Sequence, residues 1–132
     1  MRKTGILNQA ILNATGSLGH TDQIVICDAG LPIPLGVERI DLAVIRNLPR
    51  LLDVLKPIMA EIVVEKIILA EEIRTASPDL AAQIRELAGP IPIAFVSHEQ
   101  FKSLTRGAKA IVRTGEHTPF ANVILQSGVD FS

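Results

Sequence analysis

Apolar residues along the chain recur in two alternating patterns, which predict strands separated by helices. Short apolar runs rich in β-branched residues predict strands over 23–27, 63–70, 91–96, 108–113 and 122–126, with a short strand within 38–45. Helical spacing of apolar residues predicts helices over 8–18, 49–60 and 77–87, and another from 97 onward. The alternation predicts a single-domain α/β fold over residues 1–132. Its three αβα layers would hold a mostly parallel sheet with helices on both faces.

The expected helix ends carry residues with known roles at such positions. Gly19 is expected to stop the first helix in a left-handed conformation. Pro57 predicts a kink or an early end in the second helix. The segment Ser77-Pro78-Asp79 opens the third helix with a cap residue, a proline in the first turn and an acid near the positive dipole end. Ser97, with Gln100 three residues on, has the capping-box spacing and starts the last helix.

Composition narrows the range of partners. The chain has 132 residues, of which 48% are hydrophobic, which is enough to build one core. Charged residues make up 20%, below the roughly 25% of ordinary soluble domains, so part of the surface is expected to be buried in an oligomer. The net charge is -1, no basic stripe occurs, and Trp and Tyr are absent. Nucleic acid is therefore not an expected partner.

The cysteine count, the N-terminus and the spacing of polar residues exclude several further classes. Cys27 is the only cysteine, which rules out an internal disulfide or a cysteine-rich metal site. The apolar stretch after Arg2 and Lys3 breaks at Asn8, too early for a signal peptide, and no run approaches the roughly 18 residues of a membrane span. No metal-ligand spacing occurs, so a metal is not expected, and the chain has no phosphate-cradling glycine loop. The expected location is the cytoplasm.

Polar residues flank the predicted strands at places where ligands bind in α/β folds. His20 precedes the strand over 23–27, and Asp28 follows it. His98 follows the strand that ends at 96, and Thr114-Gly115-Glu116 follows the strand that ends at 113. Because ligands bind beyond the carboxyl ends of parallel strands, Asp28, His98 and the 114–116 segment are expected at one edge of the sheet. Imidazole can give and take a proton near neutral pH, so this is an enzyme-like arrangement.

Electrostatics suggests opposite roles for the two histidines, although each candidate also has a purely structural interpretation. His20, past a helix C-terminus, is expected to favour the imidazolium, and His98, at a helix N-terminus, the neutral ring. Alternatively, His20 is a polar loop residue, Asp28 bonds its own turn, and His98 merely starts a helix. His117 is expected to be solvated, and Cys27 to be a small buried hydrophobe.

Six segments together resemble a known family. They are Gly5-Ile6-Leu7-Asn8, Gly19-His20-Thr21-Asp22, Cys27-Asp28-Ala29-Gly30-Leu31-Pro32, Ser97-His98-Glu99, Arg113-Thr114-Gly115-Glu116 and Thr118-Pro119-Phe120-Ala121-Asn122. In order and spacing these segments closely resemble the D-ribose pyranase family, which is related to the L-fucose mutarotases. The resemblance runs from residue 5 to residue 131, and such a set is far more specific than any single short motif.

The resemblance implies a cytoplasmic enzyme that interconverts the β-pyranose and β-furanose forms of D-ribose. It also implies a ring-shaped homo-oligomer, usually a decamer, with active sites between neighbouring subunits and no metal or organic cofactor. Carried over by residue, His20 is the general acid/base and Asp28 binds a sugar hydroxyl. The sugar pocket is lined by His98, Asn122 and Lys102.

One departure from the family pattern leaves the preferred sugar open. The family usually has Tyr where this chain has Phe120, whose ring can still pack on a sugar but lacks the hydroxyl. One alternative function is therefore a mutarotase of L-fucose or another aldose, which needs the same acid/base groups. Another is a non-catalytic sugar-binding accessory of a transport system, which would bind sugar without accelerating its exchange.

Overall fold

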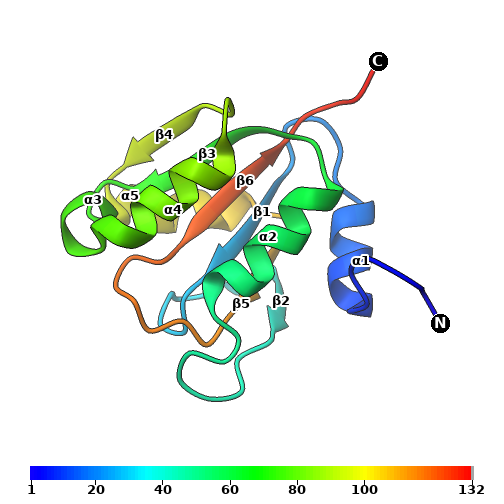
Figure 1. Cartoon of the computed structure of the whole chain (residues 1–132), viewed down its shortest axis with the longest axis horizontal. Helices are drawn as coiled ribbons and strands as arrows, with labels where there is room; N and C mark the ends of the chain where they lie inside the picture. Colours follow the sequence, from blue (N-terminus) through cyan, green and yellow to red (C-terminus); the bar gives the residue numbers. More distant parts are fainter. Residues whose placement is uncertain (132) are drawn as a thin grey trace.

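The computed structural model describes residues 1–131 and places six strands in one sheet, in the order β2-β5-β1-β6-β3-β4 (Figure 1). The strands are β1 (Gln23–Cys27), β2 (Glu38–Asp41), β3 (Val64–Ala70), β4 (Ile93–Val96), β5 (Ala110–Arg113) and β6 (Val123–Ser127). The helices are α1 (Gln9–Gly16), α2 (Leu51–Glu61), α3 (Ile73–Ala76), α4 (Pro78–Ala88), α5 (His98–Leu104) and the 3-10 turn η1 (Thr105–Gly107). Every predicted strand and helix is present, and α3 is an addition.

The sheet is mostly parallel, as predicted, and β6 is the strand that runs the other way. β5 is parallel to both β1 and β2, and β3 is parallel to β4, whereas β6 is antiparallel to both β1 and β3. The carboxyl ends of β1 to β5 and the amino end of β6 therefore share one edge of the sheet. We refer to it as the carboxyl edge, and to the opposite one as the amino edge.

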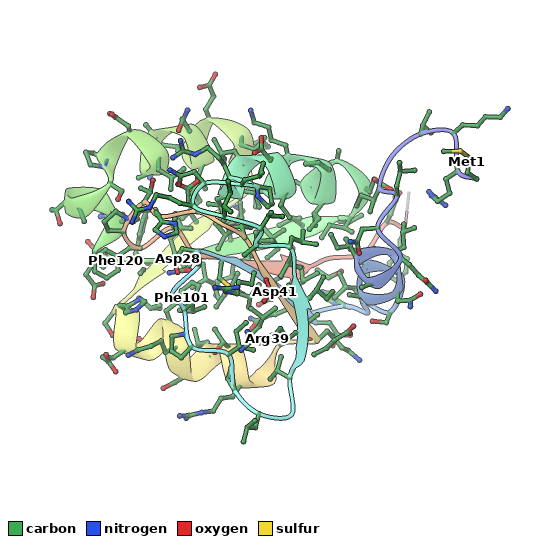
Figure 2. All side chains as sticks on the ribbon, turned by 90° about the horizontal axis from the view of Figure 1, so that it is seen from below. Met1, Asp28, Arg39, Asp41, Phe101 and Phe120 are labelled. Atoms are coloured by element: carbon green, nitrogen blue, oxygen red, sulfur yellow. The ribbon has the colours of Figure 1, made fainter. Side chains whose placement is uncertain are left out.

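Alternate residues of the central strands pack into two separate cores, which confirms the three layers. On β1, Ile24 and Ile26 join the core beneath α1, α2 and α4, while Val25 and Cys27 join the core beneath α5. Figure 2 shows α2 and α4 on one face of the sheet and α5 on the other, with Phe101 of α5 fully buried against it. A side-chain period of two is what a strand covered on both faces requires.

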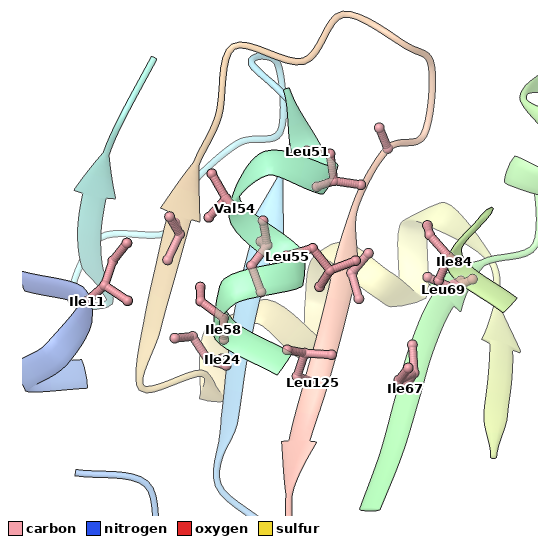
Figure 3. Packing of buried hydrophobic residues seen from close by; sticks show 14 of the residues in the cluster. Ile11, Ile24, Leu51, Val54, Leu55, Ile58, Ile67, Leu69, Ile84 and Leu125 are labelled. Carbon is pink, nitrogen blue, oxygen red and sulfur yellow. The ribbon is translucent and has the colours of Figure 1, made fainter. Parts of the chain in front are cut away.

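Helix α2 does not end early at Pro57, which was one of the two outcomes predicted for this proline. Pro57 lies within α2, which continues to Glu61. Proline removes a backbone hydrogen bond and costs about 3 kcal/mol or more in a helix interior. Burial of an apolar side chain contributes about 1.5–3 kcal/mol, and four residues of α2 pack onto the sheet, so the helix persists through an exposed proline (Figure 3). The four are Leu51, Val54, Leu55 and Ile58.

Two other predicted helix ends differ in detail. Helix α1 ends at Gly16, and Gly19 has no positive φ; instead Asp22 Oδ2 accepts the N–H of Gly19 at 2.8 Å, forming a turn. Ser77 is the N-cap residue of α4 as predicted, but its hydroxyl makes no cap bond and donates to the Pro119 carbonyl at 2.6 Å. Ser97 caps α5 as predicted by accepting a hydrogen bond from the Gln100 N–H.

No helix within residues 1–131 is both long enough and apolar enough to cross a membrane.

Candidate functional site

The carboxyl edge brings together the residues predicted to meet there. Asp28 follows β1, His98 follows β4, the 114–116 segment follows β5, and Asn122 directly precedes β6. The N–H of Asp28 donates to Asn122 Oδ1 at 2.9 Å, which joins the two binding candidates directly. Figure 2 shows Asp28 beside Phe120 at this edge.

The carboxylate of Asp28 both shapes its own turn and faces the site. Its Oδ1 accepts the N–H groups of Gly30 and Leu31, each at 2.9 Å, so Asp28 does bond its own turn. Burial raises the pKa of Asp28, and these two backbone hydrogen bonds oppose the rise. A carboxylate has about four lone-pair sites, so bonding to the turn through Oδ1 does not exhaust its capacity to bind a hydroxyl.

Two buried nitrogen atoms at the carboxyl edge lack a hydrogen-bond partner. Among residues 1–131, His98 Nδ1 and Asn122 Nδ2 are buried side-chain atoms without a hydrogen-bond partner. Asn122 Oδ1 is taken by the N–H of Asp28, so the Nδ2 amide is left as a donor. An unsatisfied buried polar group costs about 1–3 kcal/mol, so this pair points to a ligand that supplies oxygen atoms.

Phe120 covers His98 and has an unusual backbone conformation. The two rings meet edge to face, with centroids 5.1 Å apart and an interplanar angle of 80°. Phe120 has φ +59°, the left-handed region that aromatic residues rarely occupy, and such strain concentrates at functional sites. Two bonds hold this bend: the Ser77 hydroxyl to the Pro119 carbonyl, and the Asn122 N–H to the Phe120 carbonyl at 2.9 Å.

A hollow of about 410 Å³ opens beside Asp28, a size that suits a small ligand. Arg113 Nε donates to the Ala29 carbonyl at 3.1 Å, and its Nη1 donates to the Asp41 carboxylate, so the guanidinium is held in the wall. The lining residues are Asp28, Ala29, Gly30, Arg113, Glu116, His117, Thr118 and Pro119.

His20 lies at the amino edge, so one copy of the chain does not unite it with the other candidates. Its Nε2 is 2.8 Å from Glu65 Oε1, and Glu65 Oε2 accepts from Gln126 Nε2 at 2.7 Å. Hydrogen bonds from Gln126 and His20 lower the pKa of Glu65. Helix α1 ends at Gly16, four residues before His20, and the negatively charged group in contact with the imidazole is Glu65.

The remaining candidates lie as follows. Lys102 is one helical turn beyond His98, but its Nζ pairs with Glu99 Oε1 at 2.7 Å, and it borders a separate hollow of about 610 Å³ beside the 32–35 loop. His117 is exposed, as predicted. Cys27 is fully buried, as predicted, and burial raises its pKa to about 12. Residues 1–131 contain no group of three or more His, Cys, Asp or Glu side chains that could hold a metal ion.

Sequence reasoning missed the acids that position these residues. Glu65 was treated only as part of the predicted strand over 63–70. Glu72, at the end of the predicted strand over 63–70, accepts the N–H of His98 at 3.0 and 3.1 Å and so fixes the start of α5. No local pattern indicates these pairs, because their members lie 45 and 26 residues apart.

Comparisons with known proteins agree on one family. A model of the RbsD / FucU transport protein family matches residues 1–130. The chain is 54% identical over 132 residues to the D-ribose pyranase of Geobacillus thermodenitrificans, covering 100% of both chains. It is 50% identical over 131 residues to the D-ribose pyranase of Coprothermobacter proteolyticus, covering 99% of this chain and 100% of that one.

Solved structures give the same result. Bacillus subtilis RbsD complexed with D-ribose superposes with a TM-score of 0.96 at 48% identity, covering 99% of this chain and 100% of that one. The fucose mutarotase of Streptococcus pneumoniae in complex with L-fucose gives a TM-score of 0.76 at 25% identity, covering 94% of each chain.

Proposed function

The chain belongs to the RbsD / FucU transport protein family, and we propose that it is a D-ribose pyranase, an isomerase that interconverts the β-pyranose and β-furanose forms of D-ribose. One observation carries the assignment of the reaction: a relative that is 54% identical from end to end is a D-ribose pyranase. The geometry is compatible with it, because the buried nitrogen atoms of His98 and Asn122 lie at the edge where Asp28 presents a carboxylate. The proposed location is the cytoplasm.

The distribution of these residues supports a site built from two copies of the chain. Asp28, His98, Phe120 and Asn122 would form the sugar-binding half at the carboxyl edge, and His20 of a neighbouring copy would complete it from its amino edge. In such head-to-tail contacts two different surfaces meet, and the assembly closes into a ring when the rotation permits. We propose a homo-oligomeric ring of this kind, the decamer that the family resemblance implies.

Exposed apolar side chains support this assembly because they occur at both edges. Val44, Ile45 and Leu48 follow β2 at the carboxyl edge and are 72%, 67% and 51% exposed. At the amino edge, Val63 precedes β3, while Val129 and Phe131 follow β6, and all three are exposed. Contact between these two sets would remove apolar surface from water while bringing His20 of one copy to the pocket of the next.

The chemistry requires only proton transfers and an enclosed pocket. Ring opening removes a proton from the anomeric hydroxyl and delivers one to the ring oxygen; the open-chain aldehyde then recloses through a different hydroxyl. His20, held by Glu65, would carry the proton between these oxygens. Asp28 would accept a hydrogen bond from a sugar hydroxyl, and Asn122 Nδ2 would donate to a sugar oxygen.

His98 Nδ1 and the Phe120 ring would complete the contacts of the sugar. Lys102 could join them only by leaving Glu99. No covalent intermediate is required, so the protein contributes orientation and proton transfer.

Two-dimensional exchange NMR on D-ribose at equilibrium tests the proposal. With the protein present, cross-peaks should connect the β-pyranose and β-furanose signals at mixing times where the sugar alone shows none. The His20→Ala variant is the matched control and should leave the spectrum of free sugar nearly unchanged. Absence of these cross-peaks with folded wild-type protein would reject the pyranase function.

Phe120 favours one second candidate, a mutarotase of L-fucose or another aldose. The family's usual Tyr hydroxyl is absent here, so a contact that would favour ribose is lost, worth about 0.5–1.5 kcal/mol for one hydrogen bond. Exchange between the α- and β-pyranose signals of L-fucose, with D-ribose silent, would establish this function. Binding of sugar without exchange of any kind would instead indicate the transport accessory.

A further inference from the structure

The segment 114–122 joins β5 to β6 and carries Phe120 and Asn122. We propose that Glu116 is the positioning residue that fixes this segment, and with it the sugar-binding half of the site, against helix α2. The inference rests on the proposed function in so far as Phe120 and Asn122 are taken to contact the sugar. The placement of the segment is a separate claim that can be measured without any sugar.

The Glu116 side chain is almost completely enclosed, at 3% exposure, and its oxygens accept five hydrogen bonds. Oε1 accepts from Arg50 Nε at 3.3 Å and from the Leu51 N–H at 3.0 Å. Oε2 accepts from Arg50 Nη2 at 2.8 Å, the Thr118 N–H at 3.3 Å and the Thr118 hydroxyl at 2.7 Å. These bonds fill the lone pairs of a carboxylate, so Glu116 acts through the residues it holds and not by touching sugar.

The groups held by Glu116 belong to three parts of the fold. Arg50 and Leu51 begin helix α2, whose apolar face is buried against the sheet and cannot easily move. Thr118 belongs to the segment that leads to Phe120. The backbone carbonyl of Glu116 accepts the Ala29 N–H at 2.9 Å, next to Asp28. One buried residue therefore links the turn of Asp28 and the segment of Phe120 and Asn122 to a rigid helix.

Ser77 also holds this segment, beside the hydrogen bonds made by Glu116. The Ser77 hydroxyl donates to the Pro119 carbonyl at 2.6 Å, immediately before the left-handed Phe120. An aromatic residue keeps that conformation only where its surroundings impose it. Glu116 and Ser77 together supply this constraint, and the chain then returns so that Asn122 Oδ1 meets the N–H of Asp28.

Glutamine cannot replace Glu116 in this role. The Oε1 position faces two N–H donors, and the Oε2 position faces N–H and O–H donors. Whichever way a glutamine amide is turned, its NH₂ group opposes donors that the carboxylate accepts. Glu116→Gln therefore preserves the side-chain volume but breaks the hydrogen bonds made at one of the two carboxylate oxygens.

Exchange kinetics on D-ribose test the role by separating KM from kcat. Glu116→Gln should raise KM about tenfold, as expected for loss of charge-assisted hydrogen bonds that order the binding half. Its kcat should stay within about threefold of wild type, because proton transfer depends on His20 at the other edge. Glu61→Gln is the matched control, an acid that accepts the Ile6 N–H at 2.7 Å away from this segment, and should leave KM unchanged. A folded Glu116→Gln protein with unchanged KM overturns the proposal.

Hydrogen–deuterium exchange provides a test of this placement that needs no sugar. Glu116→Gln, or Ser77→Ala if the first does not fold, should speed exchange in peptides covering 28–31 and 114–122 while leaving β3 unchanged. Ser77→Ala should also raise KM about threefold. Unchanged exchange in 114–122 overturns the positioning role. If the wild-type protein does not accelerate the exchange of D-ribose, that result counts only against the proposed function.

Discussion

His20 and Asp28 flank the same strand, β1, and for that reason lie at opposite edges of the sheet. At about 3.3 Å per residue, the strand carries the chain roughly 16 Å between Gln23 and Asp28. That distance exceeds the length of a single sugar ring. A sugar that contacts Asp28 is therefore out of reach of His20 in the same copy, and the proposed site needs a neighbour.

Removing the imidazole of His20 is expected to abolish most of the activity. General acid/base catalysis contributes about 10²–10⁴-fold, so His20→Ala should lower the exchange rate by that factor. The side chain is 55% exposed, so its loss leaves no cavity in the core and fold and assembly should survive. Exchange NMR, with circular dichroism and size-exclusion chromatography alongside, checks both points. Full activity in a folded His20→Ala protein would contradict the assignment.

Glu65 is expected to matter through its contact with His20. Glu65→Gln keeps a polar group beside the imidazole but removes the negative charge 2.8 Å away, and should lower kcat about tenfold with little change in KM. Glu86→Gln, on the exposed face of α4, is the control and should behave as wild type. An unchanged kcat for Glu65→Gln would show that His20 does not depend on this partner.

The Asn122→Asp variant tests whether the Nδ2 amide of Asn122 binds the sugar, while keeping the contact between this side chain and the N–H of Asp28. The aspartate is nearly isosteric and can still accept the N–H of Asp28, but it has no donor in place of Nδ2. We expect D-ribose affinity to fall about 2–10-fold, the equivalent of one net hydrogen bond, in a folded protein. Calorimetric titration measures the affinity. Undiminished binding would mean that the sugar does not contact Nδ2.

Because of Glu116, the free energy of unfolding should depend on pH in the acidic range. Burial raises its pKa, but the hydrogen bonds from Arg50, Thr118 and Leu51 outweigh that effect and lower it from 4.5 to about 2. A depressed folded-state pKa contributes stability above about pH 4.5 that is lost as the pH falls toward 2, and the shift corresponds to about 3 kcal/mol.

The free energy of urea unfolding should therefore differ by about 3 kcal/mol between wild type and Glu116→Gln at neutral pH. The difference should narrow progressively below pH 4.5. A gap that stays constant down to pH 2.5 would contradict this account of the Glu116 pKa.

Much of the fold follows from local patterns, because burial on both faces leaves a clear mark on a strand. The run Ile24-Val25-Ile26 is apolar throughout, and its residues divide between the two cores. The reversed direction of β6 also has a sequence signal: residues 114–122 are too few for a parallel crossover, which needs about a dozen or more. Its place between β1 and β3 has no such signal, since it depends on how distant segments pack.

The site could be predicted only for residues whose place depends on the direction of the neighbouring strand alone. Asp28 and His98 were placed correctly because both follow parallel strands, and the same logic puts His20 at the far edge because it precedes one. Glu116 was visible as a polar residue at the right edge, but its role depends on Arg50, 66 residues away in sequence. Hydrogen bonds over such separations are set by tertiary packing.

The most direct test of a ribose site shared between two copies mixes two variants, each altered in a different half of the site. His20→Ala retains the binding half, and Asn122→Ala retains the imidazole. In random mixed rings, about a quarter of the sites should pair an intact binding half with an intact His20. The mixture, unfolded and refolded together, should then recover about a quarter of wild-type D-ribose exchange. Activity no greater than the sum of the two separate variants would contradict the shared site.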